Sequence, residues 1–143
     1  MIVDIHCHFV PERYIDFVQR ESAFAVRRHA VSDQSEDVPV TVGDLTFGLN
    51  RTFFDPDRQI KRLDTLRIDR TVLSLATPLI NYEVPGELAS RAAHIFNDDI
   101  AALRDRHPDR IDGWAFLPMQ DPIAAAKELR RCVTLLGLCG GHI

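Results

Sequence analysis

Short hydrophobic blocks alternate with amphipathic segments along the chain. The hydrophobic blocks lie at residues 2–6, 71–76, 111–119 and 138–143, and their length and β-branched residues are typical of buried strands. In the segments between them, apolar residues recur at spacings of three and four, as they do on one face of a helix. This order of strands and helices predicts parallel βα units, so we expect an α/β fold.

Aspartate and proline mark where the helices begin and end. Asp55 and Asp121 are each followed by proline, which predicts an N-cap residue before a helix that opens with proline. The longest helix is predicted over residues 86–106, ahead of Pro108. We expect the helix after Asp121 to turn an apolar stripe toward the core, formed by Ala126, Leu129, Val133 and Leu136.

Residues 21–55 interrupt this pattern with polar, turn-like sequence. Within them, "VPVTVGDLTFGL" (residues 38–49) alternates between apolar and polar positions and contains Gly43-Asp44, which predicts a small hairpin or an ordered loop. We interpret the segment as an insertion after the first strand and as a candidate lid over a substrate.

The regular spacing of the predicted strands is typical of a (β/α)8 barrel. A complete barrel needs about 250 residues, so the 143 residues predict a single partial domain, the N-terminal half of such a barrel with about four parallel strands. Three origins fit a half-barrel: a truncated or expressed fragment, a half-barrel that closes by dimerising, and a non-catalytic remnant that offers an interaction surface. Because the first and fourth strands have exposed edges, we expect a homo-oligomer.

Composition narrows the possible partners and location. The formal net charge of −4, without a Lys/Arg cluster, argues against nucleic-acid binding. No apolar run approaches the roughly 20 residues of a transmembrane helix, and no signal peptide is visible, so we expect no membrane association. Three widely spaced cysteines without a CxxC motif favour reduced thiols and a cytoplasmic location.

Two histidines one residue apart end the first predicted strand. In a strand, His6 and His8 point to the same side, where two imidazoles can share a metal ion; hydrogen-bonded or solvated histidines are the alternative. The same parity places Asp4 beside them as an orienting partner, although a carboxylate that faces a helix or a loop fits the sequence equally well. Cys7 points the other way and is expected to pack in the core.

At these residues the chain resembles a known family. "VDIHCHFVPE" (residues 3–12) is similar to the opening of the amidohydrolase superfamily, within the branch of the aminocarboxymuconate-semialdehyde, resorcylate and carboxyvanillate decarboxylases. The stretches at residues 55–78, 96–131 and 136–143 support the same branch, so the resemblance covers nearly the whole chain. It implies a metal-dependent (β/α)8 barrel.

The resemblance also implies site residues. The family holds zinc, and sometimes manganese, through the HxH pair, here His6 and His8, together with a histidine and an aspartate on later strands that are not among these residues. We therefore expect weak metal binding by this chain. Arg51 corresponds to a loop arginine that contacts the substrate carboxylate, with a solvated surface arginine as the alternative. Asn50 and Phe53 are weaker candidates for the pocket wall.

The expected parent function is a metal-dependent decarboxylase of a small aromatic or muconate-type carboxylate, here with an incomplete site. A metal-dependent hydrolase of the same superfamily and a non-catalytic half-barrel that self-associates are the alternatives. No Gly-rich phosphate loop and no Ser/His/Asp or Cys/His nucleophile arrangement can be assembled from the sequence. His142, in the last predicted strand, is a further candidate for the barrel interior.

Overall fold

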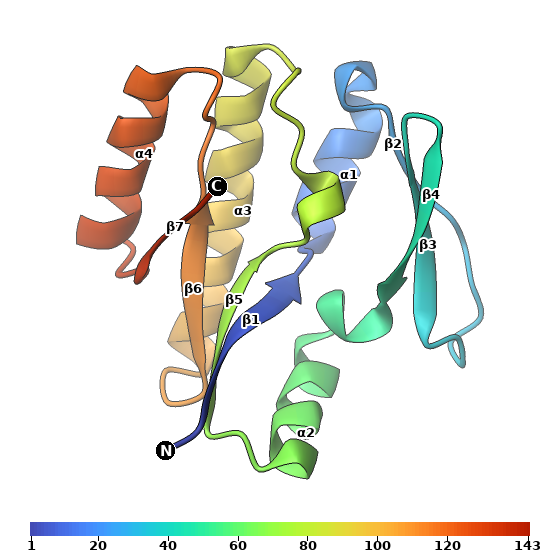
Figure 1. Cartoon of the computed structure of the whole chain (residues 1–143), viewed down its shortest axis with the longest axis vertical. Coiled ribbons are helices and arrows are strands. Elements are labelled where there is room, and N and C mark those ends of the chain that lie inside the picture. Colours follow the sequence, from blue (N-terminus) through green and yellow to red (C-terminus); the bar gives the residue numbers. More distant parts are fainter.

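The computed structural model describes residues 1–143, which form two sheets flanked by helices (Figure 1). The larger sheet is parallel, with the strand order β1-β5-β6-β7: β1 (Val3–Phe9), β5 (Arg70–Leu75), β6 (Ile111–Phe116) and β7 (Gly140–His142). The smaller sheet is antiparallel: β2 (Val26–Arg28), β3 (Asp37–Val42) and β4 (Leu45–Asn50). The helices are α1 (Glu12–Arg20), α2 (Pro56–Leu66), α3 (Gly86–Arg106) and α4 (Pro122–Thr134), with the short 3-10 helices η1 (Ser22–Phe24), η2 (Arg51–Phe53) and η3 (Thr77–Leu79).

Helices cover one face of the larger sheet. α3 packs against β6, and α1 and α4 pack on either side of α3 (Figure 1). The aromatic ring of Tyr14 lies edge-to-face with the rings of Phe96 and Phe116, and all three side chains are buried. The Tyr14 hydroxyl donates to the carbonyl of Leu79 at 3.0 Å, so its burial leaves no unpaired donor. These elements confirm the predicted α/β fold with four parallel strands and intervening helices.

The two Asp-Pro signals do begin helices. The Asp55 side chain accepts a hydrogen bond from the backbone N–H of Arg58, and α2 starts at Pro56, directly after Asp55. The Asp121 side chain accepts from the backbone N–H groups of Ile123 and Ala124 at the start of α4. Each carboxylate satisfies N–H groups that have no partner inside the helix, which is why these short motifs predicted helix starts accurately.

The buried face of α4 differs from the predicted stripe. Ala125, Glu128 and Cys132 are buried, whereas Val133 is 46% exposed and Ala126 lies at the surface. Leu129 and Leu136 do pack against the core, so the prediction was right for these two and wrong for Ala126 and Val133. It missed Glu128 because it counted only apolar residues as core residues. Glu128 is buried because its carboxylate is fully paired, and burial of a paired charge carries a smaller penalty than burial of a free one.

The insertion lies between α1 and α2 and forms the smaller sheet. The predicted hairpin is present as β3 and β4, with Gly43 at a φ of +58° in the connecting turn. The third strand, β2, was not predicted, because three residues are too few to show an alternating pattern. Backbone hydrogen bonds attach the insertion to the rest of the fold, including one from the N–H of Val10 to the carbonyl of Phe53.

Two further features of the fold concern its cysteines and the character of its helices. All three cysteines are free thiols, with Cys7 and Cys132 buried and Cys139 exposed. No helix of the structure combines the length and the apolar character needed to cross a bilayer.

Candidate metal centre

Both histidines of the motif lie near the carboxyl-terminal end of β1, on the face of the sheet that the helices leave uncovered. His8 pairs in register with Ser74 of β5, and Cys7 pairs with Leu73. Cys7 and Leu73 are buried beneath the helices, whereas His6 is exposed and His8 is half-buried. The two imidazole rings therefore project from the same side, with their centroids 5.0 Å apart.

A β-bulge separates this pair from Asp4. The register shifts between Asp4, which pairs with Thr71, and Cys7, which pairs with Leu73, so β1 has one residue more than β5 over this interval. The extra residue reverses the alternation of side chains, and Asp4 Oδ2 lies 3.8 Å from Arg62 Nη1 of α2. The parity that placed Asp4 with the histidines was wrong, and the helix-facing alternative is correct. Asp4 Oδ1 instead accepts from the backbone N–H of His6 at 3.1 Å.

Cys7 has the core position expected of it. The thiol is buried, and its sulfur accepts a hydrogen bond from Gln59 Nε2 at 2.8 Å. This contact attaches α2 to the back of β1, the strand whose opposite side carries the histidines. The bulge and the Cys7 contact together decide which side chains reach the uncovered face.

His8 is held from two sides. Its Nδ1 lies 3.2 Å from the hydroxyl oxygen of Ser74, and its ring meets the ring of Phe53 edge-on with a centroid distance of 5.3 Å. Phe53 belongs to η2, which follows the last strand of the insertion. The insertion therefore contributes directly to the wall around His8, in line with the prediction that Phe53 lines the site.

The electrostatic environment of His8 favours a neutral ring. Partial burial lowers the pKa of His8, and the nearby His6 and His142 lower it further, whereas hydrogen bonds to the backbone of Ser74 and Leu75 oppose the shift. A neutral imidazole is the form that binds a metal ion. His142, on β7, lies close enough to influence His8, and its ring centroid is 6.4 Å from that of Trp114.

The pair fits a divalent metal as a partial donor set. Two imidazoles on one face suit zinc or manganese, but no group of three or more His, Cys, Asp or Glu side chains gathers in a way that could hold an ion. A catalytic zinc site usually has three protein ligands. The structure therefore brings together two of the side chains that such a site would need.

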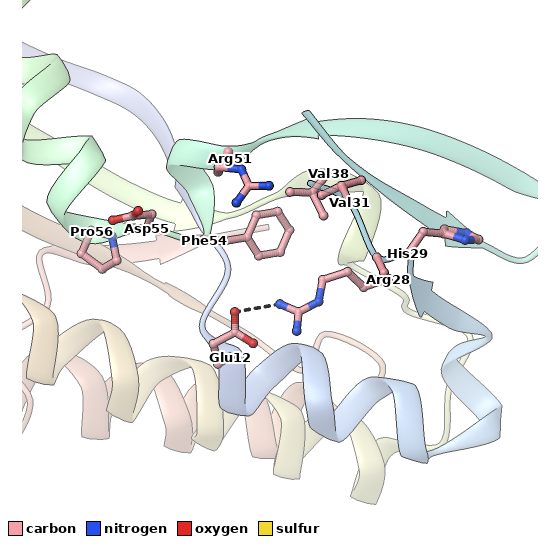
Figure 2. A pocket seen from close by; sticks show the side chains of 10 residues that line it. Glu12, Arg28, His29, Val31, Val38, Arg51, Phe54, Asp55 and Pro56 are labelled. Atoms are coloured by element: carbon pink, nitrogen blue, oxygen red, sulfur yellow. Dashed lines mark hydrogen bonds and ion pairs between the residues drawn. The ribbon is translucent and has the colours of Figure 1, made fainter. Parts of the chain in front are cut away.

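Arg51 lies on the insertion side of the molecule (Figure 2). It lines a cavity of about 420 Å³ together with Glu12, Arg28 and Phe54, and neither His6 nor His8 contributes to that cavity. The guanidinium of Arg51 donates to the backbone carbonyls of Ser35, at 2.8 Å, and Ser32, at 2.5 Å. In this arrangement it holds a turn of the insertion in place, so contact with a substrate stays a prediction.

Ser74 is the residue at this site that the sequence did not single out. It lies in the mostly apolar stretch "TVLSLA" (residues 71–76), where the pattern predicts only a serine within a buried strand. The available signal was a hydroxyl between two leucines, Leu73 and Leu75, because a buried hydroxyl usually needs a hydrogen-bond partner. Only the register between β1 and β5 identifies His8 as that partner.

Comparison with known proteins places the chain among related enzymes. The gamma-resorcylate decarboxylase of Rhodococcus jostii is 38% identical over 115 residues, which is 74% of this chain and 35% of that protein. The 2-amino-3-carboxymuconate-6-semialdehyde decarboxylase of Dictyostelium discoideum is 28% identical over 143 residues, covering 99% of this chain and 39% of that protein. The chain thus spans less than half the length of the relatives it matches.

A solved structure shows the same architecture. The dihydroxybenzoic acid decarboxylase of Polaromonas sp. JS666, with bound manganese and the inhibitor 2-nitroresorcinol, has a TM-score of 0.70 at 29% identity, over 98% of this chain and 37% of that chain. This likeness confirms the predicted N-terminal half of a (β/α)8 barrel. The sequence profile of the amidohydrolase family matches residues 3–143. The chain belongs to the amidohydrolase family.

Proposed function

We propose that the chain carries the metal-binding pair of a metal-dependent decarboxylase that acts on a small aromatic carboxylate. The observation that carries the proposal is the position of His6 and His8, together on the uncovered face near the carboxyl-terminal end of β1, where barrel enzymes place their catalytic groups. The decarboxylases among the relatives, such as the gamma-resorcylate decarboxylase of Rhodococcus jostii at 38% identity, support decarboxylation over hydrolysis.

His6 and His8 would hold a divalent metal. The manganese of the Polaromonas structure supports manganese, and two imidazoles suit zinc equally well. When bound, the metal would supply Lewis-acid polarisation of a substrate oxygen or an activated water. The lowered pKa of His8 keeps its ring neutral and able to bind, while Phe53 and Ser74 limit its movement.

Arg51 is the proposed partner of the substrate carboxylate. A guanidinium binds a carboxylate through two parallel hydrogen bonds. Nε and Nη2 of Arg51 donate to the carbonyls of Ser35 and Ser32, so Nη1 and the second proton of Nη2 are the donors left for a substrate carboxylate. The position of Arg51 within residues 21–55 is in keeping with the proposed lid role of this segment.

The free thiols agree with the proposed cytoplasmic location. Small aromatic carboxylates are the substrates named for the decarboxylases of Rhodococcus and Polaromonas, and we propose the same class here.

Replacement of the histidines tests the proposal. His6→Ala and His8→Ala are each expected to weaken Mn²⁺ or Zn²⁺ binding to the chain by about tenfold or more, since each removes one of two ligands. Isothermal titration with the metal salts measures this change. His29→Ala is the matched control, because His29 contacts Thr41 in the smaller sheet and lies outside the pair.

The reaction class is tested separately with metal-loaded protein. Any CO2 release from 2,6-dihydroxybenzoate should depend on added metal and should be lost in both histidine variants. Hydrolysis of an amide or ester without CO2 release would favour the hydrolase alternative. Metal binding that is unchanged in both variants would contradict the proposal.

A further inference from the structure

We infer that Ser74 is a positioning residue that fixes the tautomer of His8 and so presents Nε2 of the ring to the metal. The inference rests on the proposed function insofar as it concerns the metal, but the tautomer itself is a property of the chain without metal. Ser74 lies on β5 directly opposite His8 on β1, and its side chain is almost completely buried.

The inference follows from the single proton of the Ser74 hydroxyl, which can serve only one of its two contacts. The oxygen lies 3.2 Å from His8 Nδ1 and 3.3 Å from the backbone carbonyl oxygen of Cys7. A carbonyl can only accept, so a hydrogen bond to Cys7 uses the single proton of the hydroxyl. The hydroxyl oxygen then has only lone pairs left for His8, and Nδ1 must be the atom that carries the ring proton.

The reverse assignment satisfies fewer contacts. If Ser74 donated to an unprotonated Nδ1, the 3.3 Å contact with the carbonyl of Cys7 would contain no proton and would bring two oxygens together without a hydrogen bond. With Nδ1 protonated, both contacts of the buried hydroxyl are hydrogen bonds. Because two hydrogen bonds at the hydroxyl are more favourable than one, the arrangement with a proton on Nδ1 is favoured.

The tautomer decides which ring nitrogen can bind a metal ion. A neutral imidazole has one N–H and one lone pair, so a proton on Nδ1 leaves the lone pair on Nε2. The hydrogen bond that one ring nitrogen makes commonly sets the other as the metal ligand. Ser74 would also restrict the ring orientation, which lowers the entropy lost when the metal binds.

Nitrogen NMR of the metal-free chain tests the tautomer directly. Proton–nitrogen correlation spectra of the ring, recorded at about pH 8 where an ordinary histidine is neutral, should show His8 with Nδ1 protonated in the unmodified protein. Ser74→Ala should lose this preference, and Ser74→Thr, which keeps the hydroxyl, should retain it. Ser90→Ala, which removes a hydroxyl on α3 away from the pair, is the matched control.

A protonated Nε2 in the unmodified protein, or an unchanged tautomer in Ser74→Ala, would overturn the inference. A general packing defect would not restore the Nδ1–H signal in Ser74→Thr while losing it in Ser74→Ala. The comparison therefore separates positioning of the ring from a purely structural role of Ser74.

Metal titration provides the second readout. Ser74→Ala is expected to bind Mn²⁺ at least about tenfold more weakly than the unmodified chain, which is the usual effect of removing a residue that orients a ligand. Ser74→Thr should retain most of the affinity. Equal affinities of the unmodified chain and Ser74→Ala would count against the inference. If the unmodified chain binds no metal, the proposed function fails, and the tautomer spectra alone decide the role of Ser74.

Discussion

At the scale of single residues, Glu128 is the clearest case of a polar side chain used as part of the core. Its carboxylate accepts from Arg131 Nε at 2.9 Å and from Asn97 Nδ2 at 2.7 Å, and it lies 2.8 Å from His94 Nε2. Asn97 also exchanges hydrogen bonds with both backbone groups of Phe116 on β6. These four side chains, Glu128, Asn97, Arg131 and His94, form a polar cluster that holds α3, α4 and β6 together.

Removal of this carboxylate charge should destabilise the fold. Glu128→Ala is expected to lower the free energy of unfolding by about 3 kcal/mol, because the donors of Arg131 and Asn97 lose their shared acceptor. Urea unfolding measures the loss. Glu87→Ala, at an exposed position of α3, is the control and should change stability by about 0.5 kcal/mol or less. Equal effects of the two substitutions would show that the cluster contributes nothing specific.

The same residue predicts a dependence of stability on pH. Burial alone raises the pKa of Glu128, but hydrogen bonds from Arg131 and Asn97 and the charge of His94 outweigh it and lower the pKa below its ordinary value. A carboxyl whose pKa is lower in the folded state contributes stability above its unfolded pKa of about 4.3 and loses it as the pH falls through the folded value. The free energy of unfolding should therefore decrease more steeply from about pH 6 to pH 3 for the unmodified protein than for Glu128→Gln. Urea unfolding at a series of pH values measures this difference.

At the scale of elements, the helix starts depend on short local motifs. Asp121 caps α4 through the N–H groups of Ile123 and Ala124, both at 3.0 Å. Asp121→Ala is expected to cost about 1 kcal/mol, whereas Asp121→Asn keeps an oxygen acceptor and should stay close to the unmodified protein. Thermal unfolding of the two variants checks this. A loss in Asp121→Asn as large as in Asp121→Ala would indicate that the charge, and not the cap, stabilises the helix.

Strand β1 shows how one extra residue changes an element. Alternation alone placed Asp4, His6 and His8 on one face, and it was correct for the two histidines and wrong for Asp4. The bulge lies between them, and it is visible only as a shift of register against β5. A site deduced from strand parity is therefore reliable only on one side of such a bulge.

At the scale of the whole molecule, the larger sheet has one face without helices and two outer strands whose edges are unpaired. β1 and β7 are the outer strands, and Ile5 on β1 is 66% exposed. Unpaired strand edges with apolar side chains favour pairing between chains, so we expect the 143-residue chain to self-associate. Light scattering should give a mass above the 16.2 kDa of one chain, and Ile5→Lys should shift it toward the monomer. A monomeric unmodified chain would refute the expected homo-oligomer.

Features of this protein that depend on neighbouring residues could be deduced from the sequence, whereas features that depend on long-range contacts could not. The parallel βα order, the capped starts of α2 and α4, the hairpin turn at Gly43 and the shared face of His6 and His8 follow from short-range pattern, because helix caps, glycine turns and strand alternation depend on neighbours within a few residues. The bulge beside Asp4, the buried Glu128, the link between Ser74 and His8 and the engagement of Arg51 by the insertion were decided by the tertiary structure. Each of these joins residues that are far apart in the chain or depends on strand register, and such pairings are set by the packing of whole elements rather than by local preference.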